Sequence, residues 1–325
     1  MSMSINTPPY IKHPPRMSKA LVTGGCGFIG SNLVDKLVPL YDDIVVIDSL
    51  ISEANEKFYY NDSPSRQSKY RNAVKYYEYN ICDYEKTRKL YDSVDVVFHL
   101  AAESRIQPTL NNPILAAQSN TVGTCTVLQC SKEAGVKRVI YSSTSASYGL
   151  LNKIPLKEDM PDDCLNPYSV TKVAGEKLCK MYTDLFDLET VTFRYFNVYG
   201  ERQPVKGQYA PVIGIFIRQK NNNEDLTVVG DGLRTRDFTH VEDIVKGNIL
   251  AADLTNKKPV GEVINLGTGT NNSILEIAKM VSEDYVFIPD RGGESQDTLA
   301  DIDKAKQLLD WEPTITVEGW IKANI

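Results

Sequence analysis

A glycine-rich turn near the start of the sequence constrains the fold more than any other feature. Its glycines Gly24, Gly27 and Gly30 recur at every third position. The apolar run Ala20–Val22 precedes the turn. Apolar residues at helical spacing follow it, namely Phe28, Ile29, Leu33 and Leu37. A strand that turns through glycines into an amphipathic helix is typical of a parallel α/β sheet that binds a dinucleotide.

Each glycine has a separate physical role in such a turn. Gly24 permits the tight turn, Gly27 lets the backbone approach a pyrophosphate, and Gly30 lets the helix pack on the strand. Free amide groups at the start of the helix attract the anion. We therefore expect Phe28 and Ile29, which open the helix, to border the cofactor together with the glycines.

An acidic residue follows the second predicted strand and indicates which dinucleotide binds. The run Ile44–Ile47 ends at Asp48, eighteen residues after Gly30. A carboxylate at this position can accept hydrogen bonds from the adenosine ribose hydroxyls and would repel a 2′-phosphate. The sequence therefore predicts NAD rather than NADP.

A hydroxyl, a phenol and an ammonium group form a candidate catalytic set. Tyr168 and Lys172 lie four residues apart on one face of a predicted helix, and Thr144 ends a β-like run twenty-four residues before Tyr168. Such groups can pass one proton to or from an alcohol oxygen, and positive charge from Lys172 near the Tyr168 ring would favour the phenolate. The same spacing also occurs on solvated helix faces, so these residues alone leave that alternative open.

The bulk properties of the chain exclude several functions. Its 325 residues carry a net charge of −6 and no strong basic run, which argues against a nucleic-acid partner. No run of about eighteen apolar residues predicts a membrane span, and residues 1–17 resemble a loose leader rather than a signal peptide. We expect a cytoplasmic protein. The six cysteines form no CxxC pair and the three histidines are isolated, so no metal site is expected.

Strand-like runs alternate with helical patterns from residue 18 to about 196. The predicted strands are 20–23, 44–48, 74–79, 94–100, 138–142 and 190–194. This alternation predicts a doubly wound, parallel Rossmann-type α/β sheet. Residues 52–71 are polar and predict a surface excursion. We expect residues 197–325 to form mainly a smaller, discontinuous substrate lobe with a strand at 226–229. We also expect a helix at 241–252, within the segment 240–254, to pack back on the first domain.

Several motifs, taken in order, resemble the nucleotide-sugar epimerases of the extended short-chain dehydrogenase/reductase family. They are the glycine turn, Phe98–Ala102, Ser142–Thr144, Tyr168–Lys172, Arg194–Gly200, Arg236–Asp243 and Leu299–Ile302. The resemblance runs from about residue 18 to the C-terminus. It implies that Thr144 assists catalysis, Tyr168 is the base and Lys172 binds the nicotinamide ribose.

The same resemblance implies further contacts. Residues near the cofactor would be Asn80, Ile81, Leu100, Ala101, Ala102, Asn120 and Tyr195. Residues at the sugar nucleotide would be Asn197, Arg236, Arg291, Glu294 and Thr298, with the two arginines on the diphosphate. Two departures are the Asn80-Ile81 pair, where the family often has Asp-Ile, and Gly200-Glu201-Arg202-Gln203, where Gly-Pro-Arg-Gln is usual. Relatives form homodimers through helices that here would follow Asn112 and Pro167.

The residues after Thr144 separate the reactions of this family. The related 4,6-dehydratases have Asp-Glu directly after this Thr, and the uronate decarboxylases have a Glu at the second of these two positions. This chain has Ser145-Ala146 instead. Without these carboxylates, elimination lacks its acid and base. The expected reaction is 4-epimerisation of a UDP-sugar through a 4-keto intermediate. A 4-reductase, a 3-epimerase, a UDP-glucuronate 4-epimerase and a non-catalytic NAD-sensing module stay open.

Thr298 carries the expectation about the sugar. In related 4-epimerases a residue four positions after the acid matched by Glu294 borders the carbon 2 substituent, and a Tyr there excludes an N-acetyl group. Thr298 is small, so we expect UDP-N-acetylglucosamine and UDP-N-acetylgalactosamine, alongside UDP-glucose and UDP-galactose.

Overall fold

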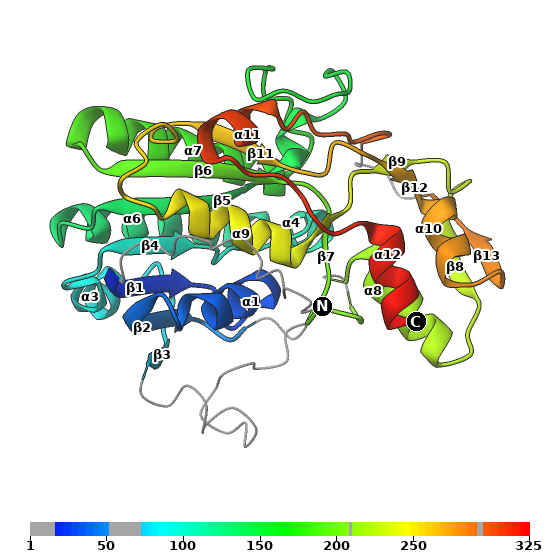
Figure 1. Ribbon diagram of the computed structural model, residues 1–325, viewed down its shortest axis with the longest axis horizontal. Helices are drawn as coiled ribbons and strands as arrows, with labels where there is room; N and C mark the ends of the chain where they lie inside the picture. The colour runs from blue at the N-terminus through cyan, green and yellow to red at the C-terminus, as the bar shows by residue number, and fades with distance from the viewer. Residues whose placement is uncertain (1–16, 52–72, 208–209, 291–294) are drawn as a thin grey trace, which may run out of the picture.

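The computed structural model describes residues 17–51, 73–207, 210–290 and 295–325 (Figure 1). Three expectations therefore lie outside the described residues. They are the leader except for its last residue, the excursion at 52–71, and the roles of Arg291 and Glu294.

A seven-stranded sheet in the order β11-β6-β5-β4-β1-β2-β3 forms the centre of the molecule. All neighbouring strands are parallel. The strands are β1 (Met17–Thr23), β2 (Tyr41–Asp48), β3 (Val74–Glu78), β4 (Val96–His99), β5 (Arg138–Thr144), β6 (Glu189–Tyr195) and β11 (Val263–Leu266). The predicted Rossmann-type class and the first six of these strands are confirmed.

The seventh strand, β11, was not predicted. It has only four residues, Asn265 interrupts its apolar pattern, and it comes from a part of the chain where glycine and proline break the alternation. It nevertheless pairs with β6 along its whole length. The C-terminal part of the chain thus completes the sheet.

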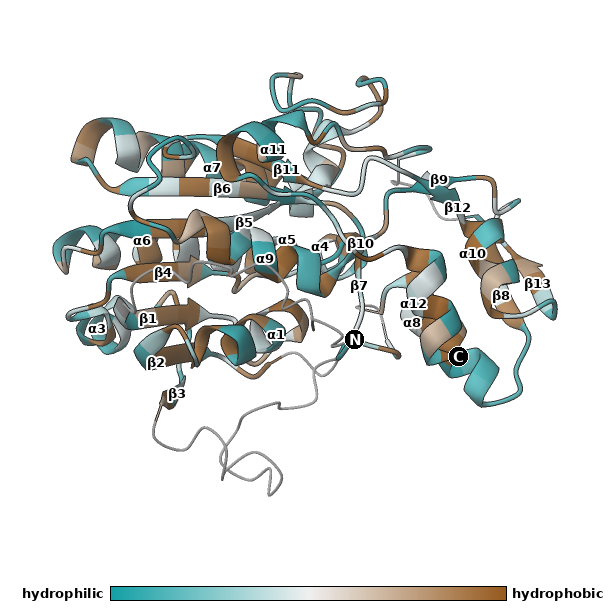
Figure 2. Cartoon of the chain, viewed as in Figure 1, coloured by the Kyte–Doolittle hydropathy of each residue, from teal (hydrophilic) through white to brown (hydrophobic). Residues whose placement is uncertain are grey.

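Helices cover both faces of the sheet, as buried parallel strands require. Successive residues of β1 face opposite sides: Ala20 and Val22 pack in one apolar cluster, and Leu21 packs in the other. The first face carries α1 (Phe28–Leu37), α9 (Val241–Ala251) and α11 (Asp303–Leu309). The second carries α3 (Tyr84–Thr87), α6 (Gly123–Glu133) and α7 (Pro167–Phe186). Figure 2 shows the resulting hydrophobic colour along the strands.

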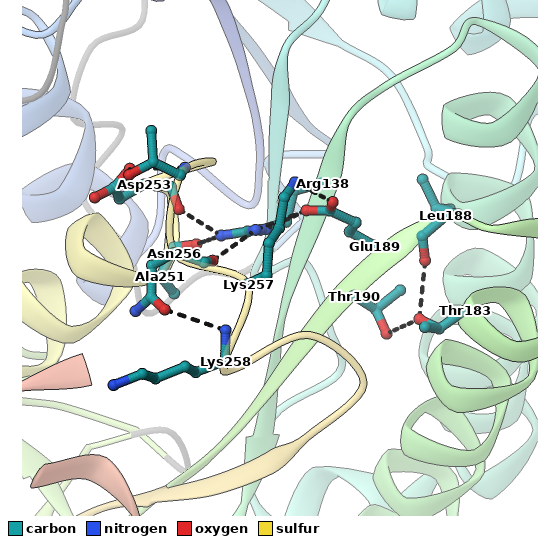
Figure 3. Close-up of polar contacts among 11 residues, drawn as sticks. Arg138, Thr183, Leu188, Glu189, Thr190, Ala251, Asp253, Asn256, Lys257 and Lys258 are labelled. Atoms are coloured by element: carbon teal, nitrogen blue, oxygen red, sulfur yellow. Dashed lines mark hydrogen bonds and ion pairs between the residues drawn. The ribbon is translucent and has the colours of Figure 1, made fainter. Parts of the chain in front are cut away.

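The helix predicted at 241–252 is α9, and it contacts α1. A buried arginine fixes its far end to the sheet. Arg138 begins β5 and binds Glu189 of β6 with Nη2 at 2.6 Å. Its Nη1 donates to the carbonyl oxygens of Ala251 and Asp253 at 2.7 and 2.8 Å, so the cation also stabilises the C-terminus of α9 (Figure 3).

A smaller lobe stands beside the carboxyl ends of the strands (Figure 1). It consists of α8 (Val212–Asn221), β8 (Leu226–Val229), β9 (Thr235–Arg236), β12 (Asn272–Ser273), α10 (Ile274–Val281), β13 (Tyr285–Ile288) and α12 (Val317–Asn324). The predicted strand at 226–229 is β8. A separate apolar cluster that includes Phe216, Val228 and Ile277 forms the core of the lobe. The short strands β7 (Val198–Tyr199) and β10 (Thr239–His240) pair where the lobe joins the sheet.

Among the described residues, no helix is both long and apolar enough to cross a bilayer.

The turn after β1 needs glycine for two reasons, and this gives a stability prediction. Gly24 has a φ of +72°, and an added Cβ would lie 2.7 Å from the backbone nitrogen of Ala101. Gly135 has a nearly equal φ of +70° but open space around it. Gly135→Ala should therefore lower the free energy of unfolding by only about 1–2 kcal/mol, the energy that a residue with a Cβ needs to adopt the left-handed conformation.

Gly24→Ala should lose about 1–3 kcal/mol more than Gly135→Ala in the free energy of unfolding, because a backbone atom cannot move aside as a flexible side chain can. Urea denaturation of both variants measures the difference. Equal losses would show that the close approach at Ala101 is not a constraint.

Candidate active site

The candidate residues lie where the parallel strands end, the usual place for a ligand in an open α/β sheet. The glycine turn follows β1, Asp48 ends β2, and Leu100 follows β4. Thr144 ends β5 and Tyr195 ends β6. Residues far apart in the sequence are brought to this one edge because all the strands point the same way.

The glycine turn has the features of a dinucleotide cradle. Gly27 caps the N-terminus of α1 and has no side chain to satisfy the first amide groups of the helix. An added Cβ at Gly30 would lie 2.1 Å from the carbonyl oxygen of Gly24, so the helix can sit this close only with glycine. These features fit the pyrophosphate of a dinucleotide.

Asp48 closes the cradle on the β2 side. Its carboxylate accepts hydrogen bonds from the backbone N–H of Cys26 and of Leu50, both at 3.0 Å. Burial raises the pKa of the Asp48 carboxyl, and these backbone hydrogen bonds oppose the rise. The carboxylate therefore lies against the glycine turn, as a ribose-binding residue must.

The pair Asn80 and Ile81 occupies the next position along this edge. The side-chain oxygen of Asn80 is exposed to solvent and accepts from the N–H of Cys82 at 2.9 Å. Ile81 is buried against Gly123 of α6. Asn80 thus keeps an exposed polar side chain where relatives often carry an acid.

The segment Leu100–Ala102 is fixed beside the end of β1. The N–H of Leu100 donates to the carbonyl of Thr23 at 3.1 Å, and the N–H of Ala101 donates to the Thr23 hydroxyl at 3.3 Å. Together with the close approach of Gly24, these bonds hold the segment over the glycine turn.

Tyr168 stands in the first turn of α7, opposite Thr144. Asn166 and Ser169 form a reciprocal capping box, and Pro167 occupies the first helical position, so the helix start is well defined. Burial raises the pKa of the Tyr168 phenol, while a hydrogen bond with the Thr144 hydroxyl and the positive charge of Arg105 lower it. The phenol and hydroxyl that the sequence pairs are thus brought together.

Lys172 is buried against the ring of Tyr141. Its Nζ lies 4.3 Å from the centre of the Tyr141 ring, and burial lowers the pKa of its ammonium to about 7, with Cys179 and Glu176 opposing the shift. The positive charge that acts on Tyr168 is that of Arg105. These contacts do not test the expectation that Lys172 favours the Tyr168 phenolate, which stays a prediction.

Arg105 acts electrostatically on the Tyr168 phenol and was not among the residues singled out in the sequence. It caps α4 (Ile106–Asn111) with a φ of +73°, a conformation that non-glycine residues rarely adopt. Backbone strain of this kind is retained mainly at functional sites. Only its position three residues after Ala102 could have suggested it.

Asn120 connects the Arg105 loop to α7. It is fully buried in a π-helical turn, Gln118–Val122, between α5 (Pro113–Ala117) and α6. Its oxygen accepts from the N–H of Glu103 at 2.8 Å, and its Nδ2 donates to the Glu103 carbonyl at 3.0 Å and to the Thr171 hydroxyl at 2.9 Å. The Asn120 amide thus connects the loop after β4, at Glu103, to Thr171 of α7, the residue directly before Lys172.

A buried ion pair joins α7 to the sheet. Glu176 Oε2 lies 2.7 Å from Nη2 of Arg194, and Glu176 Oε1 accepts from Nε of Arg194 at 3.0 Å and from the Ser143 hydroxyl. Because Ser143 immediately precedes Thr144 and Glu176 lies one turn after Lys172, the pair fixes β5, β6 and α7 together.

Tyr195 is tied down by its hydroxyl. The Tyr195 hydroxyl oxygen lies 2.9 Å from the Ser142 hydroxyl oxygen and accepts a hydrogen bond from Nδ2 of Asn248 at 2.7 Å. Burial raises the pKa of the Tyr195 phenol to about 12. The side chain is therefore neutral and oriented by β5 and α9.

Three of the predicted substrate residues lie together at the lobe. Nδ2 of Asn197 donates to the Thr298 hydroxyl at 3.3 Å, and this hydroxyl accepts from the N–H of Asp237 at 3.2 Å. Nη1 of the neighbouring Arg236 donates to the carbonyl of Gln296 at 3.0 Å. These contacts bring Asn197, Arg236 and Thr298 to one place.

Asp237 organises the loops around these residues and was also missed. Its carboxylate accepts from the N–H groups of Thr268, Gly269 and Ala300 at 2.7, 3.0 and 3.1 Å. Burial raises the pKa of this carboxyl, and the hydrogen bonds oppose the rise. An Asp within an Arg-Asp-Phe-Thr motif was the available signal.

Within the described ranges, no group of three or more His, Cys, Asp or Glu side chains is arranged to hold a metal ion.

Comparisons with known proteins agree with this geometry. Residues 20–267 match the model of the NAD dependent epimerase/dehydratase family. A putative UDP-glucose 4-epimerase of Methanocaldococcus jannaschii is 34% identical, covering 93% of this chain and 95% of the relative. A UDP-glucuronate 4-epimerase of Thermodesulfobacterium geofontis is 32% identical, covering 95% of both chains.

Solved structures are also similar over nearly the whole chain, and one of them binds a UDP-sugar. It is the UDP-N-acetylglucosamine 4-epimerase of Methanobrevibacter ruminantium in complex with UDP-N-acetylmuramic acid, with a TM-score of 0.86 and 30% identity over 95% of this chain and 97% of that chain. The chain belongs to the NAD-dependent epimerase/dehydratase family of enzymes.

Proposed function

We propose that the protein is an NAD-dependent 4-epimerase of a UDP-sugar that accepts UDP-N-acetylglucosamine and UDP-N-acetylgalactosamine, alongside UDP-glucose and UDP-galactose. The observation that carries this proposal is that Thr144 at the end of β5 and Tyr168 at the start of α7 meet at the strand edge beside the glycine turn, where the Thr144 hydroxyl lowers the pKa of the Tyr168 phenol. Ser145 and Ala146 follow Thr144, so the site lacks the carboxylates that elimination would need.

The chain's own residues would move one proton at the sugar's carbon 4 hydroxyl. Tyr168 would accept this proton and return it, while the Thr144 hydroxyl would hold the sugar oxygen within reach. NAD, when bound, supplies the oxidising and reducing chemistry by taking a hydride from carbon 4 and giving it back. Because the keto sugar can turn over between the two transfers, the configuration at carbon 4 inverts without net redox change.

We propose the remaining roles on the same basis. The cofactor would be held by Gly24, Gly27, Phe28, Ile29, Gly30, Asp48, Asn80, Ile81, Leu100, Ala101, Ala102, Asn120, Tyr168, Lys172 and Tyr195. The substrate would be held by Thr144, Asn197, Arg236, Arg291, Glu294 and Thr298. Residues 18–196 would form the cofactor domain and 197–325 mainly the substrate lobe, in a cytoplasmic enzyme.

A homodimer is part of this proposal. Apolar side chains of α4, α5, the π turn and α7 are exposed, and they are Leu110, Ile114, Val122, Val170 and Leu185. Ile114 is 71% and Leu185 68% exposed. The segments that carry these residues contact α7 or belong to it. An apolar surface of this kind supports association with a second copy through the helices expected from the sequence.

Tyr168→Phe tests the reaction. The parent protein should interconvert UDP-N-acetylglucosamine and UDP-N-acetylgalactosamine without consuming added NADH, as followed by NMR. The variant should lose about 10²- to 10⁴-fold in kcat because it lacks the proton acceptor, while its bound NAD is retained. Near-normal turnover by the variant would remove Tyr168 from the mechanism, and stoichiometric NADH consumption by the parent would indicate a reductase instead.

Thr298→Tyr tests the sugar assignment. The added ring should clash with a carbon 2 acetamido group and lower kcat/KM for N-acetylated sugars about 10- to 100-fold relative to plain UDP-hexoses. Thr298→Val is the matched control, because it removes the hydroxyl that binds Asn197 and Asp237 but keeps the size. An unchanged ratio of the two substrates in Thr298→Tyr would mean that Thr298 does not border carbon 2.

One observation favours a second substrate, a UDP-hexuronate. Arg105 is half-buried and its positive charge acts on the Tyr168 phenol, which must reach the carbon 4 hydroxyl. In a hexuronate, the carbon 6 carboxylate is bonded to carbon 5, the neighbour of carbon 4. The carboxylate would therefore lie within reach of the Arg105 guanidinium. Arginine suits this role because its fixed fork can bind both carboxylate oxygens.

Arg105→Gln tests this second candidate. The variant should lose about 10- to 100-fold in kcat/KM for UDP-glucuronate relative to UDP-glucose, the value of a charge-assisted hydrogen bond. Arg105→Lys keeps the charge but not the fork and should lose less. Equal losses for both substrates would mean that Arg105 acts on Tyr168 alone, and the uronate candidate would be wrong.

A further inference from the structure

His99 is a buried titratable residue for which the proposed reaction has no use. It is the last residue of β4 and only 1% exposed. It stands in the Phe98–Ala102 motif directly before the segment proposed to border the cofactor. Its side chain contacts two hydroxyl groups, one on each side of the ring.

The two contacts come from opposite parts of the site. Nδ1 lies 2.7 Å from the hydroxyl oxygen of Thr23, which ends β1 before the glycine turn. Nε2 lies 2.9 Å from the hydroxyl oxygen of Thr124 in α6. The ring therefore spans from the cofactor side of the sheet to the helix that follows Asn120.

The neighbouring hydrogen bonds select one neutral form of the ring. The Thr124 hydroxyl donates to the carbonyl of Asn120 at 2.6 Å, so its oxygen is left to accept from His99 Nε2–H. Burial and, to a smaller extent, the charge of Lys172 lower the pKa of the His99 imidazole to about 3. With Nε2 protonated, Nδ1 accepts from the Thr23 hydroxyl, whose oxygen accepts from the N–H of Ala101 at 3.3 Å.

A continuous chain of hydrogen bonds results. It runs from Ala101 through Thr23, His99 and Thr124 to Asn120, and Asn120 binds Glu103 and Thr171. The ring also lies 5.4 Å from the Tyr141 ring, over which Lys172 sits. The chain thus begins at the segment above the glycine turn and ends on α7 between Tyr168 and Lys172.

We propose that His99 is a positioning residue. It would fix the position of the segment Leu100–Ala102, on the cofactor side of the site, relative to the start of α7, which carries Tyr168. The proposal rests on the proposed 4-epimerase function and deepens it. The sheet alone leaves this register open, because α4, α5, the π-helical turn, α6 and β5 all lie between β4 and α7 in the sequence. Hydride transfer depends steeply on position, and a displacement of about 1 Å can cost about 10²-fold in rate.

Substitutions at His99 separate positioning from simple packing. His99→Gln can keep the bond to Thr124, His99→Asn can keep the bond to Thr23, and His99→Leu keeps neither. His99→Leu should lose about 10²-fold in kcat with little change in KM for the sugar nucleotide. The two amide variants should retain more of the rate than His99→Leu at comparable thermal stability.

Thr124→Val breaks the chain from the other side and has a matched control. Thr126 also donates its hydroxyl to the carbonyl four residues back, at 3.0 Å to Val122, but on an exposed face. Thr124→Val should lower kcat and should add little to the effect of His99→Leu, because both remove the same connection. Thr126→Val should leave kcat within about twofold of the parent.

Hydrogen exchange gives a second readout that needs neither cofactor nor turnover. In His99→Leu, amides of 100–105 and of 118–123 should exchange faster than in the parent, while those of the lobe core at 213–219 stay unchanged. If wild type converts no UDP-sugar, the proposed function fails, and this exchange pattern still decides the role of His99. Unchanged exchange in both segments, or a normal kcat in His99→Leu, would overturn the proposal.

Discussion

The site depends on one close approach between two backbone segments. The turn after β1 passes so near the segment after β4 that a Cβ on Gly24 would lie 2.7 Å from the backbone nitrogen of Ala101. Parallel pairing of β1 with β4 brings the two strand ends together, and glycine allows the turn between them. The glycine turn, Thr23 and the Leu100–Ala102 segment consequently share one position, on which the cofactor side of the site is built.

Buried polar groups then fix the catalytic helix to this position. The Arg194–Glu176 pair holds α7 to β5 and β6, and Asn120 holds the loop after β4 to Thr171. Buried groups of this kind are costly unless every partner is present, so such networks specify a single arrangement. A rigid start of α7 suits a reaction in which one phenol must meet the same oxygen before and after the sugar turns over.

The sequence allowed the fold and the meeting of Thr144 and Tyr168 at one edge of the sheet to be predicted, because both depend on local patterns. Apolar runs marked six strands, and the spacing of Thr144, Tyr168 and Lys172 marked one edge. The direction of Lys172, the strained backbone of Arg105 and the hub formed by Asp237 depend on contacts between distant segments, which no local pattern contains. The strand β11 was not predicted for a related reason. Its four residues, which include Asn265, form a strand because they pair with β6, and that pairing is not visible in the local sequence.

In the proposed reaction, one hydrogen leaves carbon 4 of the sugar and returns to the same carbon. This transfer is tested most directly with UDP-N-acetylglucosamine that carries deuterium at carbon 4, incubated with the protein in ordinary water. We expect both epimers of the equilibrium mixture to keep the deuterium at carbon 4, because the hydride never meets solvent. Loss of the label to water, or a product that lacks deuterium at carbon 4, would contradict the account.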